Sequence, residues 1–387
     1  MTGSARRHRG LRVALLLAGL LLPAGAGSLT AQQASFVHRL GADTMAVEQF
    51  TRTADRLVGE VVSRSGAVVT RLQYDVALGR DGRAVSATFR QRSAAGALLP
   101  NQPTEIRLTF TGDSVRREAV FADSTNVRVL PAVRGTPLQN PAFGLYEIPF
   151  AQMRRGNAAS ATFAAVNTGG GTPAIVTLAT AGGDSIRASS GIIYRVDRDG
   201  RLLAVDASNT TQKLMSTRAS ERVDIAAIAA TMTPVGVLSP RAVAHGSFMQ
   251  SVVFISYGRP RVRQRTVWGG MLIPFDTIWR TGANEATHLA TSRELAFSDV
   301  IVPPGLYTLW IFNARDGGPQ LVINRQIGQW GTSYDPARDL GRVSMQLAPA
   351  PAHVEEFTIT IRSLGGGRGA LDFAWGSQVA TATFTAR

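Results

Sequence analysis

Between Phe36 and about Thr217 the chain consists of short runs in which every second residue is apolar, and turn residues separate one run from the next. The run Leu72–Leu78 has leucine, tyrosine, valine and leucine at alternate positions. A period of two places the apolar side chains on one face of a β-strand, whereas a helix requires a period of about 3.6. The pattern therefore predicts half-buried strands and an all-β fold with few short helices.

Two turns in this region have nearly the same sequence. Residues 80–83 (Arg-Asp-Gly-Arg) separate the predicted strands 72–78 and 84–90, and residues 198–201 repeat the same four letters between two further runs. An Asp-Gly pair supplies the positive φ angles that a tight hairpin requires. Both segments are predicted hairpins, and shared turn chemistry explains their likeness better than an internal repeat does.

Two segments interrupt the alternation. Asp224 is a suitable N-cap for a helix over residues 225–232. A weaker helical pattern covers residues 143–153, and Pro149 is expected to kink or end that helix. The glycine run 169–171 is a predicted loop, because it does not open a helix after a strand as a phosphate-binding loop does.

Residues 233–247 have little periodicity and contain two prolines and two glycines, so we place a linker there. Beyond this stretch strands recur at intervals of about 10 residues, without repeated strand-helix-strand units. The sequence therefore predicts two antiparallel β domains, residues 32–232 and residues 248–387. The second is expected to be a β-sandwich or jelly-roll-like domain.

The first 31 residues have the order of a secretory signal. Four arginines and no acidic residue precede an apolar run from Val13 to Leu22, and Pro23 and small residues follow up to Ala31. A membrane anchor is the alternative, but the run is about half of the roughly 20 residues that a spanning helix needs. The residues after Arg6-Arg7 do not form a twin-arginine signal. We expect cleavage near Ala31, no transmembrane segment afterwards, and a periplasmic or secreted bacterial protein.

The chain contains no cysteine, so it can form neither a disulfide nor a lipid-anchored cysteine. Its formal charge is +14, and arginine provides almost all of the positive charge because Lys213 is the only lysine. A basic chain favours nucleic acid or anionic surfaces as partners. Because export argues against nucleic acid, we expect an anionic glycan or another polar envelope ligand.

The sequence contains no catalytic signature. It has no thiol nucleophile, no Gly-x-Ser-x-Gly elbow and no His-Glu-x-x-His zinc motif. Glu285 with His288, and His353 with Glu355, each offer two ligands where zinc generally requires three or four. We therefore expect no metal and no cofactor, and the sequence favours a protein that is not an enzyme.

The densest polar and aromatic region carries several long motifs. They are Ser256-Tyr257-Gly258-Arg259-Pro260, Trp268-Gly269-Gly270, the segment from Trp279 to Thr287, the segment from Pro304 to Trp310, and the segment from Gly328 to Asp335. Together these motifs resemble the bacterial family known as domain of unknown function 2911, over roughly residues 249–384. Gln264 is a departure, because a glycine is expected there. The resemblance implies no established activity, and we recognise no family in the first predicted domain.

We expect a binding site in this region. Residues 279–287 combine a large apolar side chain with guanidinium, amide and carboxylate groups, a mixture that binding sites use. Alternatively, Arg280 and Glu285 form an internal ion pair that closes a loop, with Trp279 in the core. The candidate binding residues are Arg259, Trp268, Trp279, Arg280, Asn284, Glu285 and His288.

Arg259, Arg261, Arg263 and Arg265 alternate with other residues immediately before Trp268. In an extended strand these side chains project to one side, about 6–7 Å apart. Such a row suits repeated anionic groups. The alternative is a solvated edge strand that its charges protect from pairing.

The leading hypothesis is an exported, non-catalytic binding module for a polar or anionic ligand such as an envelope glycan. The first alternative is an envelope hydrolase that uses Glu285 as acid or base, with Asn284 and Arg280 stabilising developing charge. The second is a purely structural envelope component. A catalytic role requires Glu285 in a cleft, a binding role requires an exposed Trp268 or Trp279, and a structural role leaves both tryptophans buried.

Overall fold

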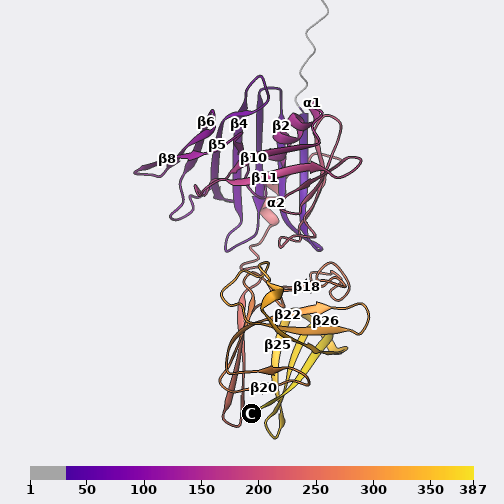
Figure 1. The fold of residues 1–387 in the computed structure, drawn as a ribbon. Helices are drawn as coiled ribbons and strands as arrows, with labels where there is room; N and C mark the ends of the chain where they lie inside the picture. Colours follow the sequence, from indigo (N-terminus) through magenta and orange to yellow (C-terminus); the bar gives the residue numbers. More distant parts are fainter. Residues whose placement is uncertain (1–31) are drawn as a thin grey trace, which may run out of the picture. The chain divides into compact units, whose positions relative to one another are not determined.

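The computed structural model describes residues 32–387, and most of their regular structure is β-strand (Figure 1). The predicted signal peptide, residues 1–31, lies outside the described residues. Within residues 32–387 no helix has both the length and the hydrophobicity needed to cross a bilayer. The helical segments of this range are α1 (Glu147–Arg155), α2 (Ile225–Thr231), and the 3-10 helices η1 (Phe143–Tyr146) and η2 (Pro336–Arg338). The all-β fold class is confirmed.

Residues 32–218 contribute a sheet of 15 strands, drawn in indigo to magenta in Figure 1. The order runs from β8 back to β1, continues with β15, and then descends to β9. Its pairs are antiparallel, apart from the parallel pair β9 and β10. Most neighbours in the sheet are therefore successive hairpin strands, and the β1–β15 pair joins the two halves. The strands are β1 (Gln32–Leu40), β2 (Asp43–Arg52), β3 (Arg56–Ser63), β4 (Thr70–Leu78), β5 (Ala84–Ser93), β6 (Glu105–Thr111), β7 (Ser114–Val120), β8 (Thr125–Pro131), β9 (Thr136–Pro137), β10 (Ser160–Val166), β11 (Ala174–Thr180), β12 (Ser185–Ala188), β13 (Ile193–Val196), β14 (Leu202–Asp206) and β15 (Met215–Arg218).

The predicted alternation and both predicted hairpins are present in this sheet. In β4 the side chains of Leu72, Tyr74 and Val76 are buried in one core, and the residues between them are more exposed. Only the glycine of each Asp-Gly pair has a positive φ angle, 72° at Gly82 and 82° at Gly200. The turn chemistry expected from the sequence therefore rests on the glycines.

Helix α1 packs against the buried face of the sheet, and Ile148 and Phe150 are part of the same core. The expectation that Pro149 would kink or end this helix is wrong. Because α1 begins at Glu147 and continues to Arg155, Pro149 is its third residue. The backbone N–H groups of a first helical turn have no intrahelical acceptor, so proline removes no hydrogen bond there.

Helix α2 begins as predicted. The side chain of its N-cap, Asp224, accepts hydrogen bonds at 3.0 Å from two backbone N–H groups of the first turn. The helix ends at Thr231, one residue before the predicted end. Ile225 and Ala229 pack against Val47 of the sheet in a small separate cluster, which fixes α2 to this part of the chain.

Residues 241–386 contribute two further antiparallel sheets, drawn in orange to yellow in Figure 1. Side chains from both sheets form one core, with Leu289 and Leu309 from one sheet and Phe357 and Phe373 from the other. Two antiparallel sheets around a shared core make a β-sandwich, as predicted. The seven-stranded sheet contains β16 (Arg241–Phe248), β17 (Ser251–Gly258), β18 (Ile278–Trp279), β19 (Thr287–Thr291), β22 (Gly305–Asn313), β23 (Pro319–Asn324) and β24 (Asp339–Ser344), and the four-stranded sheet contains β20 (Leu295–Ala296), β21 (Ile301–Val302), β25 (Gln346–Gly365) and β26 (Arg368–Ala386).

The predicted linker, residues 233–247, contains most of a strand. β16 begins at Arg241 and pairs with β17 along its whole length. Residues 232–240 lie between α2 and β16 and belong to neither a helix nor a named strand. The main cores before and after this stretch share no residue. The division of the chain into two domains stays a prediction.

Candidate functional site

Trp279, the expected apolar platform, belongs to the core of the sandwich. Its ring stacks on Trp375 with ring centroids 5.5 Å apart and meets Phe357 edge to face at 5.0 Å. Only 9% of the residue is exposed. Trp268 is half-buried, packs against the same core, and donates its indole N–H to the Trp375 carbonyl oxygen at 3.3 Å. Both tryptophans therefore contribute mainly to packing.

Arg280 and Glu285 do not form the internal ion pair that is the alternative to a binding site. Glu285 is exposed, and its Oε2 accepts a hydrogen bond from Arg241 Nη1 at 2.9 Å. The Arg280 side chain is half-buried and donates from Nε to the Gly282 carbonyl oxygen at 3.4 Å, and burial lowers its pKa. Its Nη1 atom is buried without a hydrogen-bond partner in the described part of the chain.

The electrostatics of Glu285 are unfavourable for a general acid. A backbone hydrogen bond and the Arg241 guanidinium hold its pKa below the usual range, whereas a general acid at neutral pH needs a raised pKa. The neighbouring His288 accepts a hydrogen bond at Nε2 from the Gly328 N–H at 2.9 Å, and burial lowers its pKa. Asn284 has a φ angle of 65° and donates from Nδ2 to the Ser239 carbonyl oxygen at 3.4 Å.

The row of four arginines expected before Trp268 is absent, because residues 259–266 form no strand. Arg263 and Gln264 have φ angles of 50° and 59°, which turn the chain instead of extending it. The expected glycine at position 264 matches this left-handed conformation, which glycine adopts most easily. Arg259 is used internally, since its Nη2 atom lies 3.1 Å from Glu356 Oε2.

Only some of the candidate residues of the sandwich lie in a common cavity. Trp279, Arg280 and Asn284 line one cavity. Glu285 and His288 lie apart from that cavity and are joined to Arg241 and to the loop at Gly328. Sequence reasoning placed seven candidate residues in one site, and three of them share a cavity.

A cleft that sequence reasoning missed lies at one end of helix α1, in the first sheet. Its volume is about 520 Å³, and four of its lining residues are arginines. Arg52 ends β2, Arg80 lies in the β4–β5 turn, Arg155 ends α1, and Arg201 precedes β14. We call this set of four residues and the space between them the arginine cleft.

Both Asp-Gly turns approach helix α1 at this cleft, which explains their glycines. A Cβ atom on Gly200 would lie 2.5 Å from Ala151 Cα, so only glycine fits against the helix backbone. A Cβ atom on Gly82 would meet the guanidinium of Arg155. That guanidinium donates from Nη2 to the Asp81 carbonyl oxygen at 3.0 Å, so the first turn also contacts the helix.

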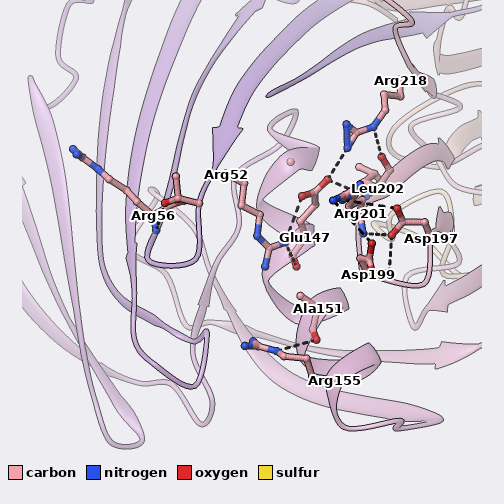
Figure 2. Close-up of polar contacts among 12 residues, drawn as sticks. Arg52, Arg56, Glu147, Ala151, Arg155, Asp197, Asp199, Arg201, Leu202 and Arg218 are labelled. Carbon is pink, nitrogen blue, oxygen red and sulfur yellow. Dashed lines mark hydrogen bonds and ion pairs between the residues drawn. The ribbon is translucent and has the colours of Figure 1, made fainter. Parts of the chain in front are cut away.

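Glu147, the first residue of α1, forms a polar cluster beside the cleft (Figure 2). Its carboxylate is fully buried and accepts hydrogen bonds from Leu202 N at 2.9 Å, Arg218 Nη2 at 3.2 Å and Arg52 Nη1 at 3.4 Å. Arg52 Nη1 also donates to the Glu147 carbonyl oxygen at 2.8 Å. Burial raises the pKa of Glu147, and Arg52 opposes that shift. The cluster holds Arg52 in one orientation at the cleft wall.

The charges at the arginine cleft are unequally paired. Arg52 shares the carboxylate of Glu147 with Arg218, and Arg201 lies 4.0 Å from both Asp197 and Asp199. Figure 2 shows Arg155 donating to the Ala151 carbonyl oxygen, at 3.3 Å. Within residues 32–387 neither Arg80 nor Arg155 has a carboxylate partner in ion-pair range, although Asp55 and Asp199 also line the cleft. The cleft can therefore accept an anionic group.

Comparison with known protein families gives a match in the C-terminal part of the chain. Residues 239–384 match the model of a family described as "Protein of unknown function (DUF2911)", which confirms the resemblance of the last third of the chain. The predicted N-terminal domain has no family match. No curated protein matches the chain.

One solved structure shows a weak likeness. It is the crystal structure of a DUF1089 family protein from Pseudomonas aeruginosa, with 16% sequence identity and a TM-score of 0.32. The match covers 42% of this chain and 89% of that chain. At this TM-score the likeness supports no statement about fold or function.

Proposed function

We propose that this protein is an exported, non-catalytic binding protein and that an anionic ligand binds in the arginine cleft. The proposal rests on one observation: Arg80 and Arg155 line the cleft, and neither has a carboxylate partner in the described residues. A guanidinium presents parallel N–H donors that fit a carboxylate or phosphate in two-pronged fashion. The ligand would complete the pairing of these two arginines.

The organisation of the cleft supports binding with little rearrangement. Arg52 is held by the buried carboxylate and the carbonyl oxygen of Glu147, so its orientation exists before a ligand arrives. Preorganised donors lose less conformational entropy on binding than free side chains do. Arg155 is similarly tied through two of its donors to Ala151 and Asp81.

The ligand class follows from charge and from the proposed location. Carboxylates and phosphates are the anions for which arginine is best suited. In the envelope of a bacterium, acidic glycans carry these groups on repeating sugars. We therefore propose an acidic envelope glycan as the ligand, with one charged sugar in the cleft.

The experiment compares a double variant with a matched control. Arg80→Gln/Arg155→Gln removes both unpaired charges, whereas Arg187→Gln removes an arginine that is exposed on β12 and does not line the cleft. The probe is a polygalacturonate oligomer, titrated by calorimetry, with a neutral dextran oligomer as reference. We expect affinity for the acidic oligomer to fall at least tenfold, about 1.4 kcal/mol, in the double variant and to stay unchanged in Arg187→Gln.

Ionic strength provides a second readout. Affinity should weaken as salt is raised, because the Debye length shrinks from about 10 Å at 0.1 M to about 3 Å at 1 M. Equal binding of acidic and neutral oligomers would overturn the proposal. So would unchanged affinity in Arg80→Gln/Arg155→Gln.

A further inference from the structure

A further pocket lies on the buried face of the first sheet, and residues of strands β4 to β8 line it. Its volume is about 300 Å³. Leu72, Phe89, Ile106 and Phe121 supply apolar wall, and two arginines supply the charge. We call this space the inner-face pocket, and it shares no lining residue with the arginine cleft.

Arg117 occupies a position where the strand pattern calls for an apolar side chain. In β7 the inward-facing positions are Val115, Arg117 and Ala119, and Arg117 is only 7% exposed. The residue directly opposite Arg117 in β8 is Arg128. Like charges directly opposite one another in neighbouring strands destabilise a sheet, so the sheet alone does not account for this pair.

No carboxylate neutralises these two arginines within residues 32–387. Arg117 donates from Nε and Nη2 to the carbonyl oxygen of Thr168 at 3.1 Å and 2.6 Å, and Arg128 donates from Nη1 to the carbonyl oxygen of Gly170 at 3.4 Å. Burial, and then the charge of Arg128, lower the pKa of Arg117. A buried charge without a counter-ion is costly, which makes an external anion a natural partner.

The glycine run 169–171 forms the loop that contacts Arg117. Gly170 has a φ angle of 73°, and a Cβ atom there would lie 2.8 Å from Arg117 Cζ. The loop therefore passes close against one part of the guanidinium. Arg117 Nη1 makes no hydrogen bond to another described residue, which leaves that group for a ligand in the pocket.

We propose that the inner-face pocket binds a small amphiphilic anion, whose carboxylate or phosphate head pairs with Arg117 and Arg128 while its apolar body contacts Leu72, Phe89 and Ile106. The apolar side chains favour an anion with an apolar body over a fully hydrated anion, because the hydrated ion would lose water without gaining apolar contact. Arg117 disfavours an apolar ligand without a charge, because its buried guanidinium would then remain unneutralised, whereas Arg128 is exposed to solvent. This site is separate from the acidic-glycan site.

The test uses three probes with the same twelve-carbon chain and different heads. Laurate, dodecyl phosphate and dodecylamine are titrated by calorimetry into the mature chain, below the concentration at which they form micelles. We expect laurate or dodecyl phosphate to bind with one-to-one stoichiometry and dodecylamine to bind at least tenfold more weakly. Which anionic probe binds better distinguishes a carboxylate head from a phosphate head. Equal binding of dodecylamine, or no binding of either anionic probe, would overturn the proposal.

Variants connect the affinity to the arginines. Arg117→Met keeps the volume and removes the charge, Arg128→Gln is the second variant, and Arg187→Met is the control because Arg187 is exposed on β12 outside the pocket. Each pocket variant should weaken binding of the anionic probe at least tenfold, and the control should not. Arg80→Gln/Arg155→Gln should bind it as the wild type does, which separates this proposal from the glycan site.

Stability distinguishes a ligand-binding arginine from one that only holds the loop. Replacing Arg117 by an apolar side chain of similar volume removes the cost of burying a charge without a counter-ion, which offsets the loss of its hydrogen bonds to Thr168. We therefore expect the melting temperature of ligand-free Arg117→Met to stay the same or rise. A lower melting temperature together with unchanged probe affinity would assign Arg117 to the loop and overturn the proposal.

Discussion

Gly200→Ala tests whether the second Asp-Gly turn is packed against helix α1. Gly200 has a φ angle of 82°, and the added Cβ atom would lie 2.5 Å from Ala151 Cα and 2.6 Å from Ala151 N. Backbone atoms cannot move aside as a flexible side chain can, so the turn and the helix would have to separate. The control is Gly182→Ala in the β11–β12 turn, where φ is 94° and nothing lies within 4 Å of the added atom.

The two substitutions differ only in the steric contact between the added Cβ atom and Ala151, which Gly200→Ala alone creates. Each places alanine in the left-handed region, at about 1–2 kcal/mol, and each restricts the unfolded chain to the same small extent. Only Gly200→Ala adds overpacking, about 1–3 kcal/mol. We expect the free energy of unfolding to fall by about 1–2 kcal/mol for Gly182→Ala and by about 2–5 kcal/mol for Gly200→Ala.

Urea unfolding, followed by two probes, measures these differences. All five tryptophans lie between residues 268 and 375, so tryptophan fluorescence follows the sandwich, whereas far-ultraviolet circular dichroism follows all strands. Both variants should shift the circular dichroism transition and leave the fluorescence transition in place. If Gly200→Ala and Gly182→Ala agree within about 0.5 kcal/mol, the proposed contact between turn and helix is refuted.

Three further outcomes test other parts of the description. The intact mass of the protein recovered from periplasm or medium should correspond to a chain that starts near Gln32, and recovery of the full-length chain from the cytoplasm would contradict export. Limited proteolysis should first cut within residues 232–240, between α2 and β16, because exposed linkers are where proteases enter; first cuts inside either half would count against two domains. Burial raises the pKa of Glu147, so the folded state holds a proton at this carboxyl group more readily than the unfolded state does. The resulting stability is fully present below the ordinary pKa of 4.5 and is lost as the pH rises through the folded-state pKa. The urea midpoint of the wild type, relative to Glu147→Gln, should therefore decrease from pH 4 upward, and a rising difference would refute that sign.

Local sequence patterns were sufficient to predict those elements whose structure depends on residues close together in the chain. The glycines at positions 82 and 200 close hairpins because only two or three residues are involved in each turn, and Asp224 caps α2 through N–H groups two and three residues away. The alternation in β4 likewise follows from the geometry of a single strand. The sequence does not reveal the effect of Pro149, because that effect depends on where α1 begins, and no side-chain cap marks that start.

The candidate site depended on more distant relations. Trp279 has the composition expected of a binding platform, yet its stacking on Trp375 places it in the core, and those residues lie almost 100 positions apart in the chain. Arg280 and Glu285 are close in sequence, but strand pairing gives Glu285 a different partner, Arg241. A sequence motif shows which groups are near one another along the chain and leaves their burial open.

The amino-acid sequence is sufficient to predict the all-β class, the hairpins and the family resemblance of the last third of the chain, because these depend on periodicity, turn chemistry and motif spacing. Which arginines meet was decided only by the tertiary structure. Arg52, Arg80, Arg155 and Arg201 come from separate strands, turns and a helix, and sheet pairing over long range brings them to one cleft. The same pairing joins β1 to β15, where His38 and Ser216 are hydrogen-bonded across 178 residues of chain. Contacts over such separations form because the apolar faces of many strands are buried together, a cooperative result that no short stretch of sequence contains.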